Sequence, residues 1–435
     1  MLQAESIKNI MKTCISRDKN PRISVVLAVY NHEQFVGQTI ESIIGQSFED
    51  WELIIIDDCS KDGSADVVRK YIQGPSHHSC PSGTGGPRPA DHEDERIRFY
   101  QAEKNRGTVR TFNELLKKAR GEYVAFIGSD DIWHSGKLQE QIEYMEQHKE
   151  TAVCFSWAEF IDENGRLYSE DEKECDYDTQ IFMHKNCTQG EVLRCFFDSA
   201  NYFCHPSALI RSEVIREIGG FDLRFRQLHD FEYWVRVLQK YPVHIIQKPL
   251  VQYRRLSTEN DSLSAVNKQN MIRFMNEIQT IIYTMIKEMN RDIFCEAFHD
   301  MLKKEITTDA RLVSEKYFVL LGWHMMGVNN RQPAARFLNE FLDDSVIECL
   351  EEEYQYSLND YYEELGNAWK LYPFDFYQEY EILEEEHQAL KKAYRSQEKA
   401  VARLNREIQG MSRTLSWRIT KPLREVKRLG VKKGK

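Results

Sequence analysis

The sequence lacks long hydrophobic runs. Among its 435 residues there is no stretch of about 18 consecutive apolar residues, the length that a membrane-spanning helix needs. The first residues, MLQAESIKNIMKTC, contain no apolar core of the kind that secretory signal peptides carry. We therefore expect a protein that neither spans a membrane nor is exported, and that works in the cytoplasm.

Paired metal-ligand motifs and the common nucleotide-binding motifs are also absent. The ten cysteines include no C-x-x-C pair, so we expect reduced thiols rather than a zinc site or a disulfide framework. Neither G-x-G-x-x-G nor G-x-x-x-x-G-K-[ST] occurs, which excludes the usual dinucleotide and P-loop phosphate cradles. The net charge of −11 argues against nucleic-acid binding by the whole protein. A nucleotide ligand would need another kind of site.

Strand and helix patterns alternate over residues 21–260. Residues 23–30, ISVVLAVY, are β-branched and almost wholly apolar, as in a parallel strand that is covered on both faces. Residues 123–127, YVAFI, have the same character and end in a turn that contains two acids. Together these patterns predict an α/β fold with a mostly parallel central sheet and helices on both faces. The other predicted strands are 52–56, 96–100, 152–161, 202–211 and 243–254, and the predicted helices are 35–44, 65–72, 109–119, 137–148, 189–197, 212–218 with Ser212 as its cap, and 229–240.

Composition divides the chain further. Beyond the α/β domain only helical patterns remain, so we expect an all-α C-terminal region. Part of that region is charged, almost free of Gly and Pro, and apolar at heptad-like steps, which predicts a short coiled coil or long helix and a homo-oligomer formed through it. The predicted boundaries are 1–20 for an N-terminal extension, 21–260 for the α/β domain, 261–375 for a helical domain, 376–410 for the coiled coil or long helix and 411–435 for a basic amphipathic tail.

Two segments have unusual compositions. Residues 74–95 are rich in Gly, Pro, Ser and His and lack apolar periodicity, which predicts a flexible insertion rather than a metal site built from its three histidines and one cysteine. Residues 411–435 carry nine Lys or Arg residues against one acid. With Trp417 among these cations, the tail suits either contact with an anionic membrane surface or an ordinary solvated end. The first alternative would place the protein peripherally on the inner face of the cell membrane.

Acidic residues recur where predicted strands end. Asp57 and Asp58 follow one strand, Asp130 and Asp131 follow another, and a third acidic stretch spans 222–230. Because ligands bind at the carboxyl ends of the strands in open α/β sheets, this recurrence indicates one site. Two adjacent carboxylates suit Mg²⁺ or Mn²⁺ shared with substrate phosphates. The alternative is that the second pair only caps the next helix.

Five motifs occur in the order ISVVLAVYN, IIIDDCSKDGS, NRGTVRTFN, GEYVAFIGSDD, and IGGFD followed by HDFEYWVR. In this order and spacing, over about residues 21–255, they resemble the inverting glycosyltransferases of family 2, of the bacterial surface-polysaccharide type. The resemblance implies the GT-A fold and transfer of a sugar from a nucleoside diphosphate, UDP first and dTDP next, to a glycan or lipid-linked acceptor. It also implies Mn²⁺ or Mg²⁺ as the cofactor.

The resemblance assigns the donor-binding residues position by position. It implies that Ala28 and Tyr30 line the pocket of the nucleobase, with the Tyr30 ring stacked on it. The carboxylate of Asp58 would accept the N3 hydrogen of uracil or thymine. Arg110 matches a basic position near the diphosphate.

The metal and the base are implied by the last two motifs. Asp130 would face the ribose or the sugar, and Asp131 would hold the metal that bridges both phosphates. Asp230 matches the general base that takes the proton from the acceptor hydroxyl. The family usually has Glu before this base, whereas this chain has His229, which we interpret as a surface residue at the start of a helix. Glu232 is a nearby rival carboxylate.

Two other functions stay open at this point. A nucleotidyltransferase could share the sheet and the acidic metal site, but it would need a Gly-rich, basic phosphate loop after the first strand, and AVYNHEQF has none. A catalytically silent protein that binds nucleotide sugars or acts as a scaffold could assemble through the helices. The intact carboxylates of Asp58, Asp131 and Asp230 argue against the silent protein.

Overall fold

The computed structural model of the chain describes residues 20–73, 94–168, 180–199, 201–256, 268–325, 328–329, 331–368, 387 and 389–407. The chain divides into two compact units, Met1–Trp369 and Lys370–Lys435. The basic tail lies outside the described residues, as do the N-terminal extension and the insertion apart from their last residues. What the sequence predicts for these segments stays a prediction.

One eight-stranded sheet forms the centre of the first unit, in the order β3-β2-β1-β4-β7-β6-β8-β5. Strands β1 to β4 run parallel to one another and β6 runs parallel to β8, whereas β5 and β7 are antiparallel to their neighbours. This mostly parallel sheet confirms the predicted fold class, and its order places the carboxyl ends of β1, β2 and β4 side by side. The strands are β1 Ile23–Val29, β2 Trp51–Asp57, β3 Ile97–Gln101, β4 Tyr123–Ile127, β5 Ile132–Trp133, β6 Val153–Ile161, β7 Leu209–Arg211 and β8 Val243–Arg254.

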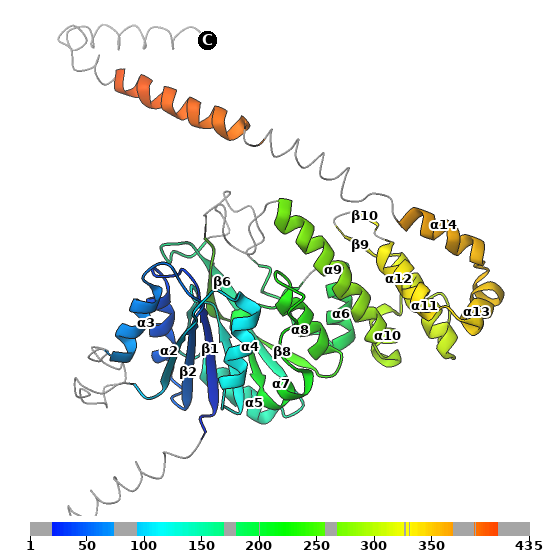
Figure 1. Cartoon of the computed structure of the whole chain (residues 1–435), viewed down its shortest axis with the longest axis horizontal. Coiled ribbons are helices and arrows are strands. Elements are labelled where there is room, and N and C mark those ends of the chain that lie inside the picture. The colour runs from blue at the N-terminus through cyan, green and yellow to red at the C-terminus, as the bar shows by residue number, and fades with distance from the viewer. Residues whose placement is uncertain are drawn as a thin grey trace, which may run out of the picture. The chain divides into compact units, whose positions relative to one another are not determined.

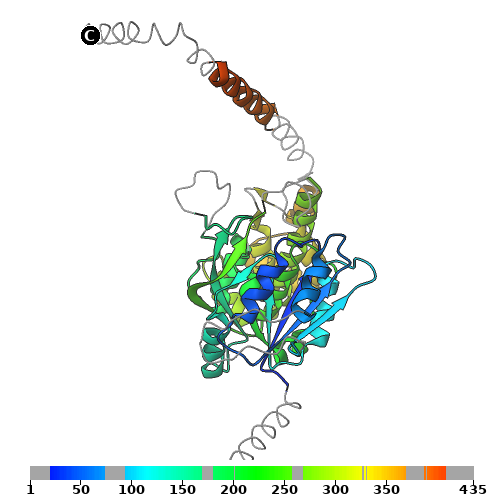
Figure 2. The same ribbon diagram turned by 90° about the vertical axis from the view of Figure 1, so that its left-hand side faces the viewer.

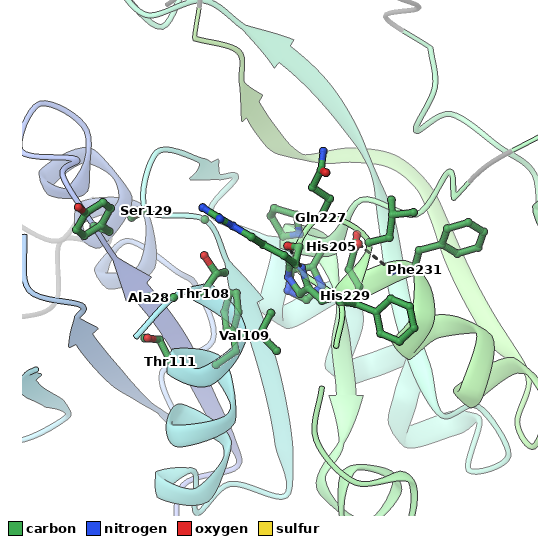
Figure 3. Close-up of a pocket in the computed structure, with 18 of the residues that line it drawn as sticks. Ala28, Thr108, Val109, Thr111, Ser129, His205, Gln227, His229 and Phe231 are labelled. Carbon is green, nitrogen blue, oxygen red and sulfur yellow. Dashed lines mark hydrogen bonds between the residues drawn. The ribbon is translucent and has the colours of Figure 1, made fainter. Parts of the chain in front are cut away.

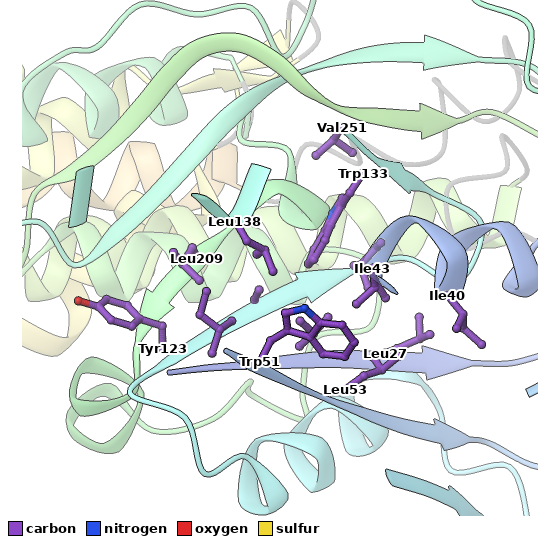
Figure 4. Packing of buried hydrophobic residues seen from close by; sticks show 14 of the residues in the cluster. Leu27, Ile40, Ile43, Trp51, Leu53, Tyr123, Trp133, Leu138, Leu209 and Val251 are labelled. Atoms are coloured by element: carbon purple, nitrogen blue, oxygen red, sulfur yellow. The ribbon is translucent and has the colours of Figure 1, made fainter. Parts of the chain in front are cut away.

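Helices cover both faces of the parallel strands, which is why β1, β2 and β4 are buried along nearly their whole length. On one face, Ile43 of α2 and Leu138 of α5 pack in a core that contains Leu27 of β1 (Figure 4). On the other face, the ring of Phe112 in α4 lies 5.9 Å from that of Phe126 in β4. The helices are α2 Val36–Ile44, α3 Ser64–Gln73, α4 Thr108–Lys118, α5 Lys137–Gln147, α6 Gln189–Asp198, α7 Ser212–Ile218 and α8 His229–Leu238.

The strand predicted over 202–211 is wrong for most of its length. Only Leu209–Arg211 is a strand, and a 3₁₀ turn, His205–Ser207, precedes it. Pro206 has no N–H to donate to a sheet, and the hydroxyl of Ser207 donates to the carbonyl of Cys204 at 2.7 Å, which stabilises the turn. The segment therefore leaves the sheet where it borders the site described below.

Two predictions about helix caps are also wrong. Ser212 is the first residue of α7 rather than its cap, and its hydroxyl donates to the carbonyl of Gly121 at 2.6 Å. The acids Asp130 and Asp131 do not cap a helix either, because β5 follows them and α5 begins only at Lys137 without a side-chain cap. The acidic pair is therefore available for another role.

Among the described residues of the first unit, the region after β8 is helical, as predicted, with one exception. Two short strands, β9 His324–Met325 and β10 Val328–Asn329, pair in antiparallel orientation. Helix α9 packs against α8 and α10 packs against α6, and Figures 1 and 2 show these helices at the end of the unit opposite to α2 and α3. The boundary predicted at residue 260 thus lies inside one compact unit, and independent folding of the helical domain stays a prediction. The helices are α9 Lys268–Glu288, α10 Arg291–Phe298, α11 Asp309–Leu321, α12 Gln332–Phe341, α13 Asp344–Tyr354 and α14 Leu358–Ala368.

In the second unit, residues 389–407 form a helix. Its apolar side chains are exposed, with Leu390 at 70% and Leu404 at 56%. The coiled coil that would cover them stays a prediction. Across the part of the chain that the structure describes, no helix combines the length and the apolar character needed to cross a bilayer.

Candidate active site

A single cavity of about 1290 Å³ brings together every site residue that the sequence predicts. It opens at the carboxyl ends of β1, β2 and β4, where an open α/β sheet binds its ligands. Figure 3 shows Ala28, Thr108 and Ser129 on one side of it, and Gln227, His229 and Phe231 on the other. The predicted residues that line it are Ala28, Tyr30, Asp58, Arg110, Asp130, Asp131 and Asp230.

The end of the cavity next to β1 and β2 offers a ring and a carboxylate. Tyr30 follows β1 and is 40% exposed. The two oxygens of Asp58 accept main-chain N–H groups, at 2.9 and 3.1 Å from Arg106 and at 2.7 Å from Gly107. Gly107 has a φ of +86°, a conformation that favours glycine. Because Oδ2 of Asp58 accepts from both residues and Oδ1 only from Arg106, Oδ1 can accept one more hydrogen bond.

The first turn of α4 supplies positive charge to the cavity. Arg106 and Arg110 both line it, and neither forms an ion pair among the described residues. The N-terminus of α4 begins after Gly107 without a side-chain cap, and the helix dipole there favours anions. This end of the cavity is therefore suited to a diphosphate. Sequence reasoning missed Arg106, although it lies in the quoted motif NRGTVRTFN.

The turn after β4 carries one buried acid, Asp131, and one half-buried acid, Asp130. Asp131 is only 2% exposed, and its Oδ1 accepts the main-chain N–H of Arg254 at 2.9 Å. Burial, and next the charge of Asp130, raise the pKa of Asp131 well above its ordinary value. Burial likewise raises the pKa of Asp130, against the opposing effect of His32. Two carboxylates that burial makes hard to ionise favour a bound cation that neutralises them.

The donor set fits a metal that is shared with substrate. Among the described residues no group of three or more His, Cys, Asp and Glu side chains gathers at one point. A divalent ion at this turn would therefore have carboxylate ligands from Asp130 or Asp131 and would complete its shell with phosphate oxygens and water, as Mg²⁺ and Mn²⁺ commonly do. Of these two residues, Asp131 is the one that the sequence predicts as the metal ligand.

Arg254, at the end of β8, holds the turn that contains Asp130 and Asp131 in place through hydrogen bonds. Its Nε donates to the carbonyl of Asp130 at 2.8 Å, and its Nη1 donates to the carbonyls of Asp162 and Glu163 at 2.8 and 3.1 Å. Its main-chain N–H holds Asp131, as described above. No sequence pattern indicates this role, because the contact joins residues 123 positions apart.

Asp230 lies in the first turn of α8 and lines the cavity. Its Oδ2 accepts a hydrogen bond from Nδ2 of Asn201 at 3.1 Å, and its Oδ1 accepts the N–H of Phe231 at 2.8 Å. Burial raises the pKa of Asp230, which makes its carboxylate a better proton acceptor. The rival Glu232 does not line the cavity and instead binds Nε and Nη2 of Arg236 at 2.6 and 2.9 Å.

His229 is not the surface residue that the sequence suggested. It is buried at 9% exposure, its Nδ1 lies 3.2 Å from the carbonyl of Arg226, and its ring lies 6.1 Å from that of His205. The first turn of α8 packs inward against α4, with the ring of Phe112 near His229. His205, which sequence reasoning missed, has no hydrogen-bond partner for either ring nitrogen among the residues that the structure describes, and burial lowers its pKa to about 3. It is therefore a neutral side chain in the cavity lining.

Glu277 of α9 holds the loop that leads into α8. Its carboxylate accepts three consecutive main-chain N–H groups, from Arg226 and Gln227 at 2.9 Å and from Leu228 at 2.8 Å. These donors lie in the loop that ends at Leu228, the residue that precedes α8 and offers no side-chain cap. The helical region thereby positions the helix that carries Asp230.

Replacing Glu277 with glutamine is expected to lower kcat by about tenfold or more with little change in KM, because the loop before α8 loses one of its two acceptor oxygens and Asp230 shifts. The loss of stability should be about 1–3 kcal/mol. The matched control is Glu315→Gln. Glu315 is also buried and accepts main-chain N–H groups from Lys303 and Lys304 at 2.9 and 2.7 Å, away from the cavity. Steady-state kinetics below both melting temperatures should show the loss of kcat in the Glu277 variant alone. Equal kcat values would mean that Glu277 has no part in placing Asp230.

Comparison with protein families gives one match, to the family described as glycosyl transferase family 2, over residues 24–219. The matched segment contains β1, β2, α4 and β4 with their site residues, and it ends before Asp230.

Individual proteins are also similar to this chain. The uncharacterized glycosyltransferase MJ1057 of Methanocaldococcus jannaschii is 28% identical over 257 residues, which cover 58% of this chain and 77% of that protein. The putative teichuronic acid biosynthesis glycosyltransferase TuaG of Bacillus subtilis is 27% identical over 249 residues, which cover 56% and 82%. Among solved structures, S. aureus TarS in complex with UDP-GlcNAc is 16% identical with a TM-score of 0.47, over 79% of this chain and 89% of that one.

Proposed function

The chain belongs to glycosyl transferase family 2, and on that premise we propose that it is a metal-dependent, inverting glycosyltransferase. It moves a sugar from a nucleoside diphosphate to a glycan or lipid-linked acceptor. The observation that carries this proposal is the convergence of all seven predicted site residues on one cavity. They come from the ends of β1, β2 and β4 and from the first turns of α4 and α8, so no single element's periodicity explains why they meet.

The donor binds with its base between Tyr30 and Asp58. The exposed ring of Tyr30 offers a stacking face, and the free capacity of Asp58 Oδ1 matches an N–H donor such as N3 of uracil. Arg106 and Arg110 lie where the diphosphate follows, and guanidinium groups bind phosphate oxygens well. UDP is therefore the first nucleotide to test, and dTDP the next.

The reaction needs one protein base. Asp230 takes the proton of the acceptor hydroxyl, whose oxygen attacks the anomeric carbon on the face opposite to the diphosphate and inverts its configuration. Asp131 would hold a divalent cation, and the chemistry that this ion would supply is neutralisation of the charge on the leaving diphosphate, so that no protein acid would be required. Asn201 keeps the carboxylate of Asp230 oriented while it accepts the proton.

The acceptor belongs to a polysaccharide or glycolipid. Support comes from the name of the Bacillus relative, which refers to teichuronic acid biosynthesis, and from the size of the cavity, which exceeds the volume usual for small-molecule sites. Both the donor and an acceptor therefore have room beside Asp230.

Release of nucleoside diphosphate from UDP-, dTDP- and GDP-sugars tests this function, since transferases commonly pass donor sugar to water slowly. We expect one donor to be turned over at least about tenfold faster than the others and only with Mn²⁺ or Mg²⁺, and EDTA should abolish the reaction. Binding of a nucleotide sugar without turnover, even when cell glycolipids are supplied, would instead indicate a silent binding protein.

A further inference from the structure

His32 lines the cavity, although the sequence assigns it no role. It lies between β1 and α2, two residues after Tyr30, and its side chain is 26% exposed. Its Nδ1 lies 2.7 Å from Oγ of Ser129 and 4.0 Å from Oδ1 of Asp130. Figure 3 shows Ser129 on the same side of the cavity as Ala28. The ring of His32 therefore connects the loop that carries Tyr30 with the turn that carries the acids.

Hydrogen bonds hold the main chain around His32 in place. Asn31 has a φ of +53°, its side-chain oxygen accepts the N–H of Lys61 at 2.8 Å, and its own N–H donates to Oγ of Ser60 at 2.9 Å. The N–H of His32 donates to Oγ of Ser64 at 2.9 Å. These bonds join the loop after β1 to the loop after β2. The imidazole ring is therefore oriented before a ligand binds, which lowers the entropy that binding costs.

The second ring nitrogen of His32 is available to a ligand. Among the described residues, Nε2 of His32 forms no hydrogen bond, and it is not one of the polar atoms sealed from solvent. A neutral imidazole donates from one nitrogen and accepts at the other, and a hydroxyl such as that of Ser129 can serve Nδ1 in either tautomer. Nε2 can therefore donate to, or accept from, a polar group of a ligand in the cavity.

His32 occupies the stretch of the cavity that the ribose of a donor would occupy. On the proposed function, the base lies at Tyr30 and Asp58, and the diphosphate lies near Arg110 and Asp131. The ribose joins the base to the diphosphate, so it must lie between these two ends. His32 follows Tyr30 by two residues and its ring contacts the turn that leads to Asp131.

A hydroxyl suits this position better than a phosphate does. The carboxylate of Asp130 lies near the same ring, and when ionised it repels an anion. A ribose hydroxyl both donates and accepts, so it can donate to Asp130 and accept from His32. A hydrogen atom in place of that hydroxyl would leave Nε2 of His32 without a partner, which costs free energy when the ligand covers the nitrogen.

We propose that His32 makes the donor site selective for ribonucleotides, because its Nε2 binds a hydroxyl of the ribose. Ser129 holds Nδ1 and thereby sets the direction of Nε2. The donor is therefore a sugar carried by a ribonucleoside diphosphate, and a deoxyribonucleotide such as dTDP binds more weakly. This inference rests on the proposed function and narrows its donor.

Titration calorimetry with the full chain in excess Mg²⁺ tests the inference. The ligands are UDP, 2′-deoxy-UDP, 3′-deoxy-UDP and dTDP, or the corresponding GDP series if GDP binds more tightly than UDP. We expect the native chain to bind the ribonucleotide at least about tenfold more tightly than one of its two deoxy analogues. That analogue identifies the hydroxyl that His32 binds.

Two substitutions of His32 separate its nitrogens from its shape. In His32→Asn the side-chain amide still reaches Ser129 in place of Nδ1, but nothing replaces Nε2. We expect the ribonucleotide to bind about tenfold more weakly and the discrimination to fall to about twofold or less. His32→Phe keeps the edge-to-face packing against Phe35, loses both nitrogens and should lose the discrimination as well, so the test does not depend on the folding of one variant.

His134→Asn is the matched control. His134 pairs with Glu159 at 3.0 Å and does not line the cavity, so this variant should discriminate as the native chain does. A structural role of His32, or a contact to phosphate, would weaken binding of the ribonucleotide and of both analogues by the same factor. That result would overturn the inference, as would equal binding of all three ligands by the native chain, discrimination that persists in the His32 variants, or a preference for dTDP.

The same titration separates this inference from the transferase proposal. If a nucleoside diphosphate binds without discrimination between ribose and deoxyribose, the inference fails and the transferase proposal stands. If discrimination depends on His32 but no nucleotide sugar is turned over, the inference stands and the transferase proposal fails. If no nucleotide binds, both fail.

Discussion

Asp230→Asn is expected to lower kcat for donor turnover by about a thousandfold and to leave nucleoside diphosphate binding within about twofold. Asparagine has the shape of aspartate but cannot take the proton of the attacking hydroxyl. Binding should survive because the proposed donor contacts lie at the ends of β1, β2 and β4, whereas Asp230 lies on α8. Initial rates and calorimetric titration of the same preparation separate the two effects.

Glu232→Gln is the control for this substitution. Glu232 lies two residues further along α8 and pairs with Arg236 rather than lining the cavity. We expect its loss to reduce stability and to change kcat by less than about threefold. A large loss of kcat in the Glu232 variant with none in the Asp230 variant would identify the rival carboxylate as the base.

The pH dependence of kcat/KM tests independently whether Asp230 is the general base. Burial raises the pKa of Asp230 above its ordinary value, so the carboxylate becomes ionised, and able to accept a proton, only at a higher pH than an exposed aspartate. The acid limb of the profile should therefore lie above the range of ordinary aspartates. Asp230→Asn should remove that limb from the residual activity.

Asp131→Asn is expected to lower metal-stimulated turnover at least about a hundredfold. Asparagine offers a neutral oxygen and no longer neutralises a divalent ion. The variant should bind the nucleoside diphosphate with an affinity that no longer depends on Mn²⁺. Asp222→Asn, outside the cavity lining and paired with Arg224 in the native chain, is the matched control and should keep its metal dependence.

Stability provides a second reading of Asp131 that does not require activity. Burial has the largest effect and the charge of Asp130 the second largest, and both raise the pKa of Asp131 in the folded protein. A carboxyl with a raised folded pKa contributes stability that is fully present below its unfolded pKa and is lost as the pH rises toward the folded pKa. The metal-free native chain should therefore lose stability as the pH rises above about 4, and Asp131→Asn should lose less.

At neutral pH this difference should appear as a higher melting temperature. The metal-free Asp131→Asn chain should melt about 2 °C or more above the native chain, because an uncompensated buried charge has been removed. Mn²⁺ together with the nucleotide should stabilise the native chain and have little effect on the variant. An equal metal-induced rise in both proteins would show that Asp131 holds no metal.

The contacts that helix α9 makes with the site could not be predicted from sequence patterns. Glu277 supports the loop before α8 from 49 to 51 positions away, and nothing in the local composition of α9 distinguishes it from Glu288, the other glutamate on that helix. The burial of His229 has the same origin, because its environment comes from α4 and the 3₁₀ turn rather than from its own helix. The residues next to His229 in the sequence therefore led to the wrong prediction that it lies at the surface.

The sequence by itself determined the mostly parallel sheet, the alternation of β1 to β4 with their helices and the positions of the principal carboxylates, but not β5 or the 3₁₀ turn before β7. It could do so because apolar runs at strand periodicity specify β1, β2 and β4, and βαβ connections bring their carboxyl ends to one edge. Tertiary structure alone decided which side chains support those acids. Asn201, Arg254 and Glu277 meet the site through packing between distant segments, and the cost of leaving buried carboxylates and main-chain N–H groups without partners selects those contacts only once the chain has folded.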